Sequence, residues 1–456
     1  MSNNDARRTT RRRMCVQNTI AIIAKISSKI EPALIAYRRD WHKYAETGWC
    51  EFRTASLIAR RLTELGYRVH LGREVIDEAG RMGVPDHDIL QSRWQRAQAQ
   101  GGDPEFLPLL EEGFTGVVGV LKNGAGPTVG IRFDIDANEL QESAAETHRP
   151  AREGFASIHP EATHACGHDG HAAVGLGVAD VLARLQPSWR GVVKLIFQPA
   201  EEGVRGARAM VDAGVVDDVD VLLAHHLYSG VKPGLVTGGK GGYLSTTKFD
   251  ALFTGAPAHA AGAPHAGKNA LLAAATAVLN LYALPRHREG VTRVNVGRLQ
   301  AGSGRNVIPS HAHLVIETRG ASNALNAYMY DYAIRILESA AQMHDCTLEI
   351  KPMGAAQGAD SSPELAGRVE QIALQFGEFT LKPSENGGGS EDYTWMMRRV
   401  QENGGQATFI ALGADIADGE SGLGHHTAEF DFDERALAQA VRLLSAVAVD
   451  SLALAE

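Results

Sequence analysis

A short segment rich in histidine, His164-Ala-Cys166-Gly-His168-Asp169-Gly170-His171, comes directly before an apolar run that is rich in alanine and glycine. Thiolate and imidazole groups are good ligands for transition metals. Within a helix, a Cys and a His two residues apart would point to different faces, but in a loop that ends at a helix start both can face one point. The segment therefore predicts a metal site. The alternative is that Asp169 caps the helix and the histidines are solvated.

Two adjacent carboxylates, Glu201 and Glu202, follow the strand-like run Leu195-Ile-Phe-Gln-Pro-Ala. In α/β proteins, ligands bind at the carboxyl ends of strands, and neighbouring carboxylates can divide the work between holding a cation and moving a proton. A Glu-Glu pair after a strand is more commonly part of a solvated loop, so the pair alone is weak evidence. Its position at a strand end favours a site.

Two His-His pairs occur farther along the chain. His225-His226 ends the expected strand Val219 to Ala224, and His425-His426 follows a glycine-rich stretch. A single buried His is more often a hydrogen-bonded core residue than a ligand, but pairs at two further strand or loop ends are hard to explain in that way. One Cys, one Glu and three His could form a cage for two metal ions. A water between two cations is acidic, and a free carboxylate can take its proton, so the expected reaction is hydrolysis.

The elements that must position these side chains alternate between strands and helices. This alternation predicts an α/β domain with a central mixed sheet covered by helices. Strands are expected at 116–121, 128–133, 192–197, 219–224 and 406–412, and helices at 30–44, 51–65, 170–185, 207–213, 364–376 and 434–454. The polar stretch from Gly72 to Gly113 is expected to be an insertion rather than part of the core.

After a glycine-rich break, a second series follows the order β-α-β-β-α-β, which is typical of a ferredoxin-like α+β domain. Its strands are expected at 246–253, 292–299, 312–317 and 346–351, and its helices at 269–284 and 324–344. We predict a disordered tail (1–14), a catalytic domain in two parts (15–243 and 354–456) and an inserted lid or dimerisation domain (244–353).

Composition disfavours several classes of protein. The chain has 45 Lys and Arg against 54 Asp and Glu, and the net charge of -9 disfavours a nucleic-acid partner. No apolar stretch approaches the roughly 20 residues that cross a membrane. The arginines between Arg7 and Arg13 resemble the start of an export signal, but the apolar run behind them is short and lacks a cleavage pattern. Four scattered cysteines do not suggest a disulfide framework, so we expect a cytoplasmic location.

The motifs and their order resemble the metal-dependent aminoacylase and carboxypeptidase family, in the branch of hippurate hydrolases and indole-acetyl-amino-acid hydrolases. The resemblance implies a binuclear metallohydrolase domain with an inserted lid. The motifs that carry it span nearly the whole chain: Arg39-Asp40-Trp41-His42, Asp134-Ile-Asp136-Ala137, His164 to His171, Gln198-Pro-Ala-Glu201-Glu202-Gly203, Gly304-Arg-Asn306-Val-Ile-Pro309, Ser390-Glu391-Asp392 and His425-His426.

This resemblance also implies a role for each matching residue. Glu201 would be the general acid and base, and Asp136 would support the ligands from behind. His259, in the lid, would reach an active site across a dimer and stabilise the oxyanion, and Asn306 would lie near the substrate carboxylate. The implied metal ligands are Cys166, His168, Glu202, His226 and His426. A shift by one residue, to His225 or His425, stays open within each pair.

Within the branch, Gly72-Arg-Glu-Val, Arg81-Met-Gly-Val-Pro and Gln300-Ala-Gly-Ser-Gly-Arg-Asn resemble a subgroup that hydrolyses aminobenzoyl-glutamate. The resemblance implies cleavage of p-aminobenzoyl-glutamate to p-aminobenzoate and glutamate. Arg305 could then hold one carboxylate of the glutamyl group, and the alternative is a surface arginine in a glycine-rich turn. Asn138-Glu139-Leu140 departs from the usual family pattern, which has Pro in this segment, so the rim of the site is expected to differ.

Other functions share these motifs. An N-acyl amino-acid amidohydrolase or a carboxypeptidase of the same family would carry them, and so would a catalytically silent, metal-binding partner subunit. Retention of Glu201 speaks against a silent subunit. We expect two divalent ions per chain, manganese rather than zinc, although a thiolate ligand favours zinc. As partners we expect a small amide substrate and either a second copy or a homologous subunit.

Overall fold

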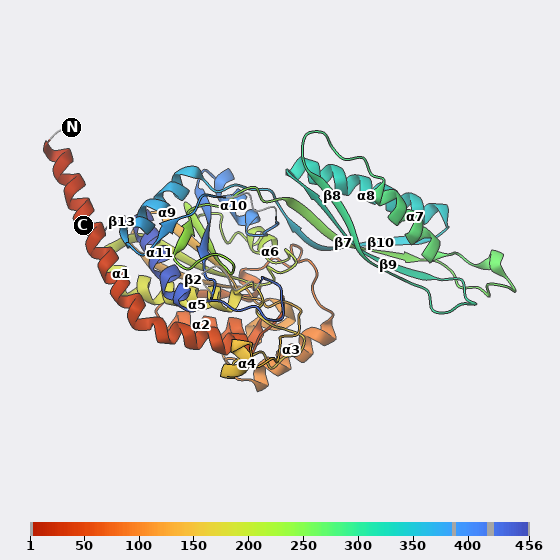
Figure 1. Ribbon diagram of the computed structural model, residues 1–456, viewed down its shortest axis with the longest axis horizontal. Coiled ribbons are helices and arrows are strands. Elements are labelled where there is room, and N and C mark those ends of the chain that lie inside the picture. The colour runs from red at the N-terminus through yellow and green to blue at the C-terminus, as the bar shows by residue number, and fades with distance from the viewer. Residues whose placement is uncertain (1–2, 385–388, 417–423, 455–456) are drawn as a thin grey trace.

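The computed structural model describes residues 3–384, 389–416 and 424–454, with side chains between residues 18 and 452 of these ranges. It shows a large and a small domain, each with its own hydrophobic cluster (Figure 1). The larger cluster gathers residues from both ends of the chain, whereas the smaller one is confined to residues 249–341. The small domain is therefore an insertion in the large one, as the β-α-β-β-α-β order of the expected strands and helices predicts.

The large domain is built on a mixed sheet with the strand order β1-β2-β4-β3-β5-β12-β6-β11. Strands β4, β3, β5 and β12 are parallel to one another, so their carboxyl ends meet at one edge of the sheet. The strands are β1 (Arg68–Leu71), β2 (Val117–Asn123), β3 (Thr128–Asp134), β4 (Trp189–Gln198), β5 (Val221–Tyr228), β6 (Leu235–Thr237), β11 (Thr380–Leu381), β12 (Gln406–Gly413) and β13 (Ala453–Leu454), which pairs with β4.

Helices surround this sheet and fill out the large domain: α1 (Asn3–Lys43), α2 (Phe52–Glu64), α3 (His87–Ala99), α4 (Arg149–Glu153), α5 (His168–Arg184), α6 (Ala207–Asp212), α9 (Pro363–Gln375), α10 (Thr394–Glu402) and α11 (Arg435–Ser451). Helix α5 is buried almost throughout and packs against β3, α1 and α11. Its glycines permit this close approach, because a Cβ at Gly175 would collide with the ring of Phe197. Helix α1 begins at Asn3, within the segment that we expected to be a tail.

The stretch from Gly72 to Gly113 is part of the core, so our expectation of a peripheral insertion was wrong. Helix α3 and the 3-10 segment η2 (Leu107–Gly113) place Leu90, Leu107 and Leu110 in the larger hydrophobic cluster. Leu90 lies in α3, whereas Leu107 and Leu110 lie in η2. No single period connects them, and the sequence pattern therefore appeared polar.

The small domain, which we call the lid, has the predicted order of elements. Its antiparallel sheet has the strand order β10-β7-β9-β8, and α7 and α8 pack on it and on each other (Figure 1). The elements are β7 (Ser245–Thr254), α7 (Ala270–Tyr282), β8 (Thr292–Ala301), β9 (His311–Gly320), α8 (Asn323–Met343) and β10 (Thr347–Ala356). Thr246 pairs with Ala356, so the chain enters and leaves the lid through two neighbouring strands. Among the described helices, none combines the length and apolar character of a membrane span.

Candidate metal centre

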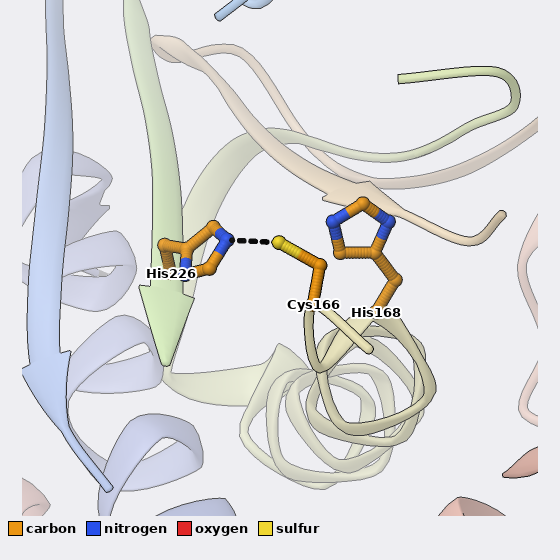
Figure 2. Close-up of side chains that lie close together, drawn as sticks. All are labelled: Cys166, His168 and His226. Carbon is orange, nitrogen blue, oxygen red and sulfur yellow. Dashed lines mark hydrogen bonds between the residues drawn. The ribbon is translucent and has the colours of Figure 1, made fainter. Parts of the chain in front are cut away.

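The predicted metal ligands converge at the carboxyl ends of the parallel strands. Cys166 and His168 lie at the start of α5, Glu202 follows β4, His226 lies within β5, and His426 follows β12. Ligand atoms within each of three groups lie within 4.8 Å of one another: Cys166 with His168 and His226 (Figure 2), Cys166 with Glu202 and His426, and His168 with Glu201 and Glu202. Because the groups share members, all the predicted ligands surround one centre.

The two buried histidines of this centre present the same ring nitrogen to it. His168 Nδ1 donates to the backbone carbonyl of Asp136 at 2.9 Å, and His226 Nδ1 donates to that of Leu227 at 2.9 Å. Each Nε2 therefore keeps a lone pair for a cation. His226 Nε2 lies 3.4 Å from Cys166 Sγ (Figure 2).

Asp136 binds the backbone of the two adjacent glutamates. Its buried carboxylate accepts the backbone amide of Glu201 at 3.0 Å and that of Glu202 at 2.9 Å. The loop that carries them is tightly turned, because Ala200 and Val204 both adopt the left-handed conformation, with φ of 51° and 61°. This conformation is costly for a β-branched residue such as Val204, and such strain is typical of functional loops.

The donor atoms of this centre fit a divalent metal. Among the described residues, buried His168 Nε2 and Glu202 Oε1 have no hydrogen-bond partner, and unpaired buried polar atoms are rare. His426 Nε2 lies 3.2 Å from Glu202 Oε1, outside hydrogen-bonding geometry. Thiolate, imidazole and carboxylate ligands together suit zinc and manganese. The residues present can therefore hold the metal ions that the sequence predicts.

The charges of this centre also call for a cation. Burial raises the pKa of the Cys166 thiol, and burial lowers the pKa of His226 well below its usual value. Burial, with the carboxylates of Glu391 and Glu202, raises the pKa of Glu201 well above the usual value. Burial also opposes charge on Glu202, but the neighbouring His426 lowers its pKa to about 2. A divalent ion would stabilise the deprotonated thiol and offset the crowding of carboxylates.

The first members of the two His-His pairs, His225 and His425, lie beside the centre. His225 is buried in β5, with its ring 4.9 Å from that of His171, and it belongs to none of the ligand groups. His425 Nδ1 lies 3.7 Å from Cys166 Sγ, while its Nε2 accepts the backbone amide of Ser229. The geometry thus groups His226 and His426, rather than their neighbours, with the other ligands. Strand β5 runs on to Tyr228, so the expectation that it ends before the pair was wrong.

A buried acidic cluster lies behind Glu201, and its members Asp134, Glu391 and Asp392 belong to motifs for which the sequence predicted no role. The fully buried guanidinium of Arg132 contacts Asp134 at 2.6 Å, Glu391 at 3.0 Å and Asp392 at 3.3 Å. Carboxylate oxygens of Glu201, Glu391 and Asp392 lie within 4.8 Å of one another. A single arginine inside the apolar run of β3 was the available signal, because a buried arginine requires acidic partners.

Asp169 binds buried cations instead of capping α5, so the predicted alternative of a cap was wrong. No side chain caps this helix, and Asp169 Oδ2 accepts Arg38 Nε at 2.9 Å and contacts His42 Nδ1 at 2.8 Å. Arg38 is fully buried and also contacts Asp431 at 2.7 Å and Glu434 at 3.2 Å. These contacts tie α1 and the C-terminal segment to the helix that begins with His168.

Glu142 extends this network to the rim of the site. It lies between His42 Nε2 at 2.9 Å and His148 Nε2 at 2.7 Å, and it accepts the backbone amide of Ser157 at 2.5 Å. Burial favours the neutral acid, but His148 and His42 outweigh it and lower the pKa of Glu142 to about 2. Glu142 is therefore ionised at neutral pH and holds the rim segment against α1.

The predicted lid residues lie away from the metal ligands of their own chain. His259, Arg305 and Asn306 are exposed, and none belongs to a ligand group. The loop after β7 and the loop between β8 and β9 meet at the end of the lid that is remote from the large domain, where His259 pairs with Val307 (Figure 1). His259 Nδ1 accepts the amide of Gly262 at 3.0 Å, which leaves the proton on Nε2. Action of these residues on a second chain stays a prediction.

A cavity of about 500 Å³ lies beside the centre, between the large domain and the lid. The large domain contributes Asn138, Glu139, Glu202 and Arg205, and the lid contributes Lys248 and Asn295. Cavities of roughly 300 to 1,000 Å³ hold small-molecule ligands. The segment in which the chain departs from the family pattern therefore lines the space next to the proposed ligands.

Comparison with known proteins agrees with this geometry. The chain is 49% identical to one of the subunits of the p-aminobenzoyl-glutamate hydrolase of Escherichia coli (strain K12), over 93% of this chain and 97% of that protein. It is 48% identical to indole-3-acetyl-aspartic acid hydrolase of Enterobacter agglomerans, over 92% and 96% of the two chains. The crystal structure of an aminobenzoyl-glutamate utilization protein from Klebsiella pneumoniae matches with a TM-score of 0.81 and 42% identity, over 93% and 97%.

A more distant structure supports the fold. A dinuclear metal binding peptidase from the M20 family of Bacillus subtilis matches with a TM-score of 0.62 and 24% identity, over 93% of this chain and 99% of that one. Residues 130–450 match the description "Peptidase family M20/M25/M40". The chain therefore belongs to the peptidase family M20/M25/M40 and is a hydrolase with the fold of that family.

Proposed function

We propose that this chain hydrolyses the amide bond of p-aminobenzoyl-glutamate and releases p-aminobenzoate and glutamate. The observation that carries the proposal is the single centre that groups Cys166, His168, Glu202, His226 and His426 beside the further carboxylate of Glu201. The similarity to the Escherichia coli hydrolase, which extends over nearly the full length of both chains, supports the substrate. The nearest alternative is an indole-3-acetyl amide of aspartate, the compound named in the Enterobacter agglomerans relative.

The chemistry is divided between the proposed metal ligands and Glu201. The five ligands would hold two divalent ions, which when bound polarise the scissile carbonyl and acidify water. Glu201 accepts a proton from the attacking water and passes it to the amide nitrogen, which leaves as the amino group of glutamate. His259 of a second chain would donate from Nε2 to the developing oxyanion.

The proposal includes manganese as the metal and an assembly with a second chain, in the cytoplasm. Ligands from histidine and glutamate accept manganese readily, although Cys166 also suits zinc. The relative from Escherichia coli is named as one subunit of its hydrolase, which supports pairing with a homologous chain, and a homodimer is the alternative. Metal content of the purified protein and its mass in solution, alone and with a homologous chain, test both points.

The direct test is the purified chain supplied with manganese or zinc. Glutamate release from p-aminobenzoyl-glutamate is compared with hydrolysis of acetylated and indole-acetylated amino acids, and a chelator should abolish all activity. A chain that binds metal but cleaves none of these compounds, alone or with a homologue, would support the silent subunit instead.

Glu201→Gln separates catalysis from metal binding. Because Glu201 moves protons and is not one of the ligands, the variant should bind metal as the wild type does while kcat falls about 10²- to 10⁴-fold. Metal content by atomic emission is the control. Unchanged turnover in a fully loaded variant would refute the assignment of Glu201 as the base.

A further inference from the structure

The cavity between the domains contains two cationic side chains that the proposed chemistry does not use. Arg205 lies in the loop that contains Glu201 and Glu202, and Lys248 comes from strand β7 of the lid. Both line the space that also borders Glu202. Positive charge next to a proposed ligand of the metal ions is a feature that binding of a neutral substrate would not require.

Arg205 is held rigidly, with hydrogen-bond donors to spare. Its Nε donates to the backbone carbonyl of Glu202 at 2.8 Å and its Nη1 to that of Gly83 at 3.2 Å. A Cβ at Gly48 or Gly83 would collide with the Arg205 side chain, so glycines make the space that it occupies. A guanidinium has five N–H groups, and no carboxylate of the described residues forms an ion pair with this one. The fixed guanidinium thus keeps donors and a full charge for a ligand.

Lys248 is a second cation without a partner in the described part of the chain. No ion pair or hydrogen bond engages its amine, and burial lowers its pKa although the carboxylates of Glu201, Glu317 and Glu202 oppose that shift. The other charged groups of the lid sheet nearby are already paired, since Arg319 contacts Glu317 at 3.1 Å and His313 contacts Asp250 at 2.7 Å. A half-buried lysine without an anion is costly, because its charge has lost part of its hydration.

We propose that Arg205 and Lys248 form a binding site for the side-chain carboxylate of an acidic amino acid, and that they make the enzyme select N-acylated glutamate or aspartate. The two cations line the same cavity from different domains, and in the proposed complex one carboxylate contacts both. A guanidinium and an ammonium suit this role, since charge-assisted hydrogen bonds to carboxylates are the strong ones. The inference rests on the proposed function, and it leaves the α-carboxylate to the exposed lid residues Arg305 and Asn306 of a second chain.

Two substrates that differ in a single functional group test the proposal. p-Aminobenzoyl-glutamate and p-aminobenzoyl-glutamine share the acyl group, the scissile amide and the α-carboxylate, and only the side-chain carboxylate is replaced by an amide. The wild type should prefer the glutamate compound in kcat/KM. Lys248→Met should lower kcat/KM for that compound about 10- to 100-fold, mainly through KM, and change the value for the glutamine compound by less than about threefold.

Matched variants distinguish charge recognition from damage to the structure. Lys248→Arg should keep most of the preference for glutamate, because it retains the charge. Lys351→Met removes a lysine from an exposed position of β10 in the same lid and should behave as the wild type. Arg205→Met should also lower kcat/KM for the glutamate compound more than for the glutamine compound. Its thermal unfolding is measured as well, to detect any loss of packing of this side chain against Gly48 and Gly83.

The outcomes separate this inference from the proposed function. If Lys248→Met lowers kcat/KM equally for both compounds, or if the wild type shows no preference between them, the carboxylate site is refuted even though the enzyme cleaves the amide. If the wild type cleaves neither compound, the proposed substrate is wrong. The same variants are then compared on indole-3-acetyl-aspartate and indole-3-acetyl-asparagine, where a selective loss on the aspartate compound supports the site and an equal loss refutes it.

Discussion

Replacing Asp136 by Asn tests how a carboxylate behind the proposed metal ligands affects metal binding and stability. The buried carboxylate accepts the backbone amides of Glu201 at 3.0 Å and Glu202 at 2.9 Å, and its Oδ1 also lies 3.3 Å from His168 Nδ1. Asparagine has the same shape but only one accepting oxygen. Its NH₂ group must therefore face at least one N–H donor that previously had an acceptor.

The size of the effect follows from these contacts. Leaving one buried donor unsatisfied costs about 1 to 3 kcal/mol, so the metal-free variant should unfold with a free energy lower by that amount. Loss of a partner behind a metal ligand typically lowers metal affinity about 10- to 100-fold. His168 keeps its 2.9 Å hydrogen bond to the backbone carbonyl of Asp136, because the substitution does not remove that carbonyl. We therefore expect the loss of metal affinity to lie near the lower end of this range, about tenfold.

Two measurements decide the outcome. Competition with a chromophoric chelator gives the metal affinity, and urea unfolding of the metal-free protein gives the stability. Asp86→Asn, at an exposed position, is the matched control. If the affinity of the Asp136 variant stays within about twofold of the wild type and its stability within about 0.5 kcal/mol, the assignment of Asp136 as the support of this centre is wrong.

Three further predictions concern the buried network and the lid. Arg38→Met leaves three buried carboxylates without their shared cation, so urea unfolding should show a loss of about 3 to 5 kcal/mol, and a change below about 1 kcal/mol would contradict the role given to the network. The pKa of Glu142 is lowered to about 2, so its contribution to stability is full above pH 4.5 and is lost as the pH falls toward 2. Glu142→Gln should therefore destabilise the protein by about 2 kcal/mol at pH 7 and make the free energy of unfolding less dependent on pH between 4.5 and 2. An unchanged dependence on pH would contradict this role. Arg305→Ala should lower kcat/KM on glutamyl and alanyl amides by similar factors, because both carry the α-carboxylate that this guanidinium is proposed to bind, and unchanged values would remove that role.

The regular elements of the chain were predictable because each has its own hydrophobic period. The lid illustrates this best: its strands and helices begin and end within a few residues of the positions expected from alternation and from three- and four-residue spacing. The stretch from Gly72 to Gly113 shows the limit. Its buried leucines lie in two separate elements, α3 and η2, which pack on α2 and on each other, and the local pattern does not reveal these partners.

The ligands of the centre were accessible from sequence because motif spacing limits the choices. His226 and His426 each had one neighbour of the same type, and only the geometry of β5 and of the segment after β12 places the second member of each pair in the ligand groups. Arg205 and Lys248 were missed because an arginine after a strand and a lysine in an amphipathic strand are ordinary surface residues by pattern. Their shared cavity exists only after the lid has folded against the large domain.

The pairing of Thr246 with Ala356 has a consequence for recombination between relatives. The ends of the inserted segment are neighbours, separated by the spacing of two hydrogen-bonded strands, about 5 Å. Exchanging everything between them would transfer Lys248, His259 and Arg305 as one block, while Cys166 and the other metal ligands stay behind. A short turn can also close the gap without rethreading the central sheet. Because Arg205 stays with the metal ligands in the large domain, chimaeras of related hydrolases would show how much of the selectivity travels with the lid.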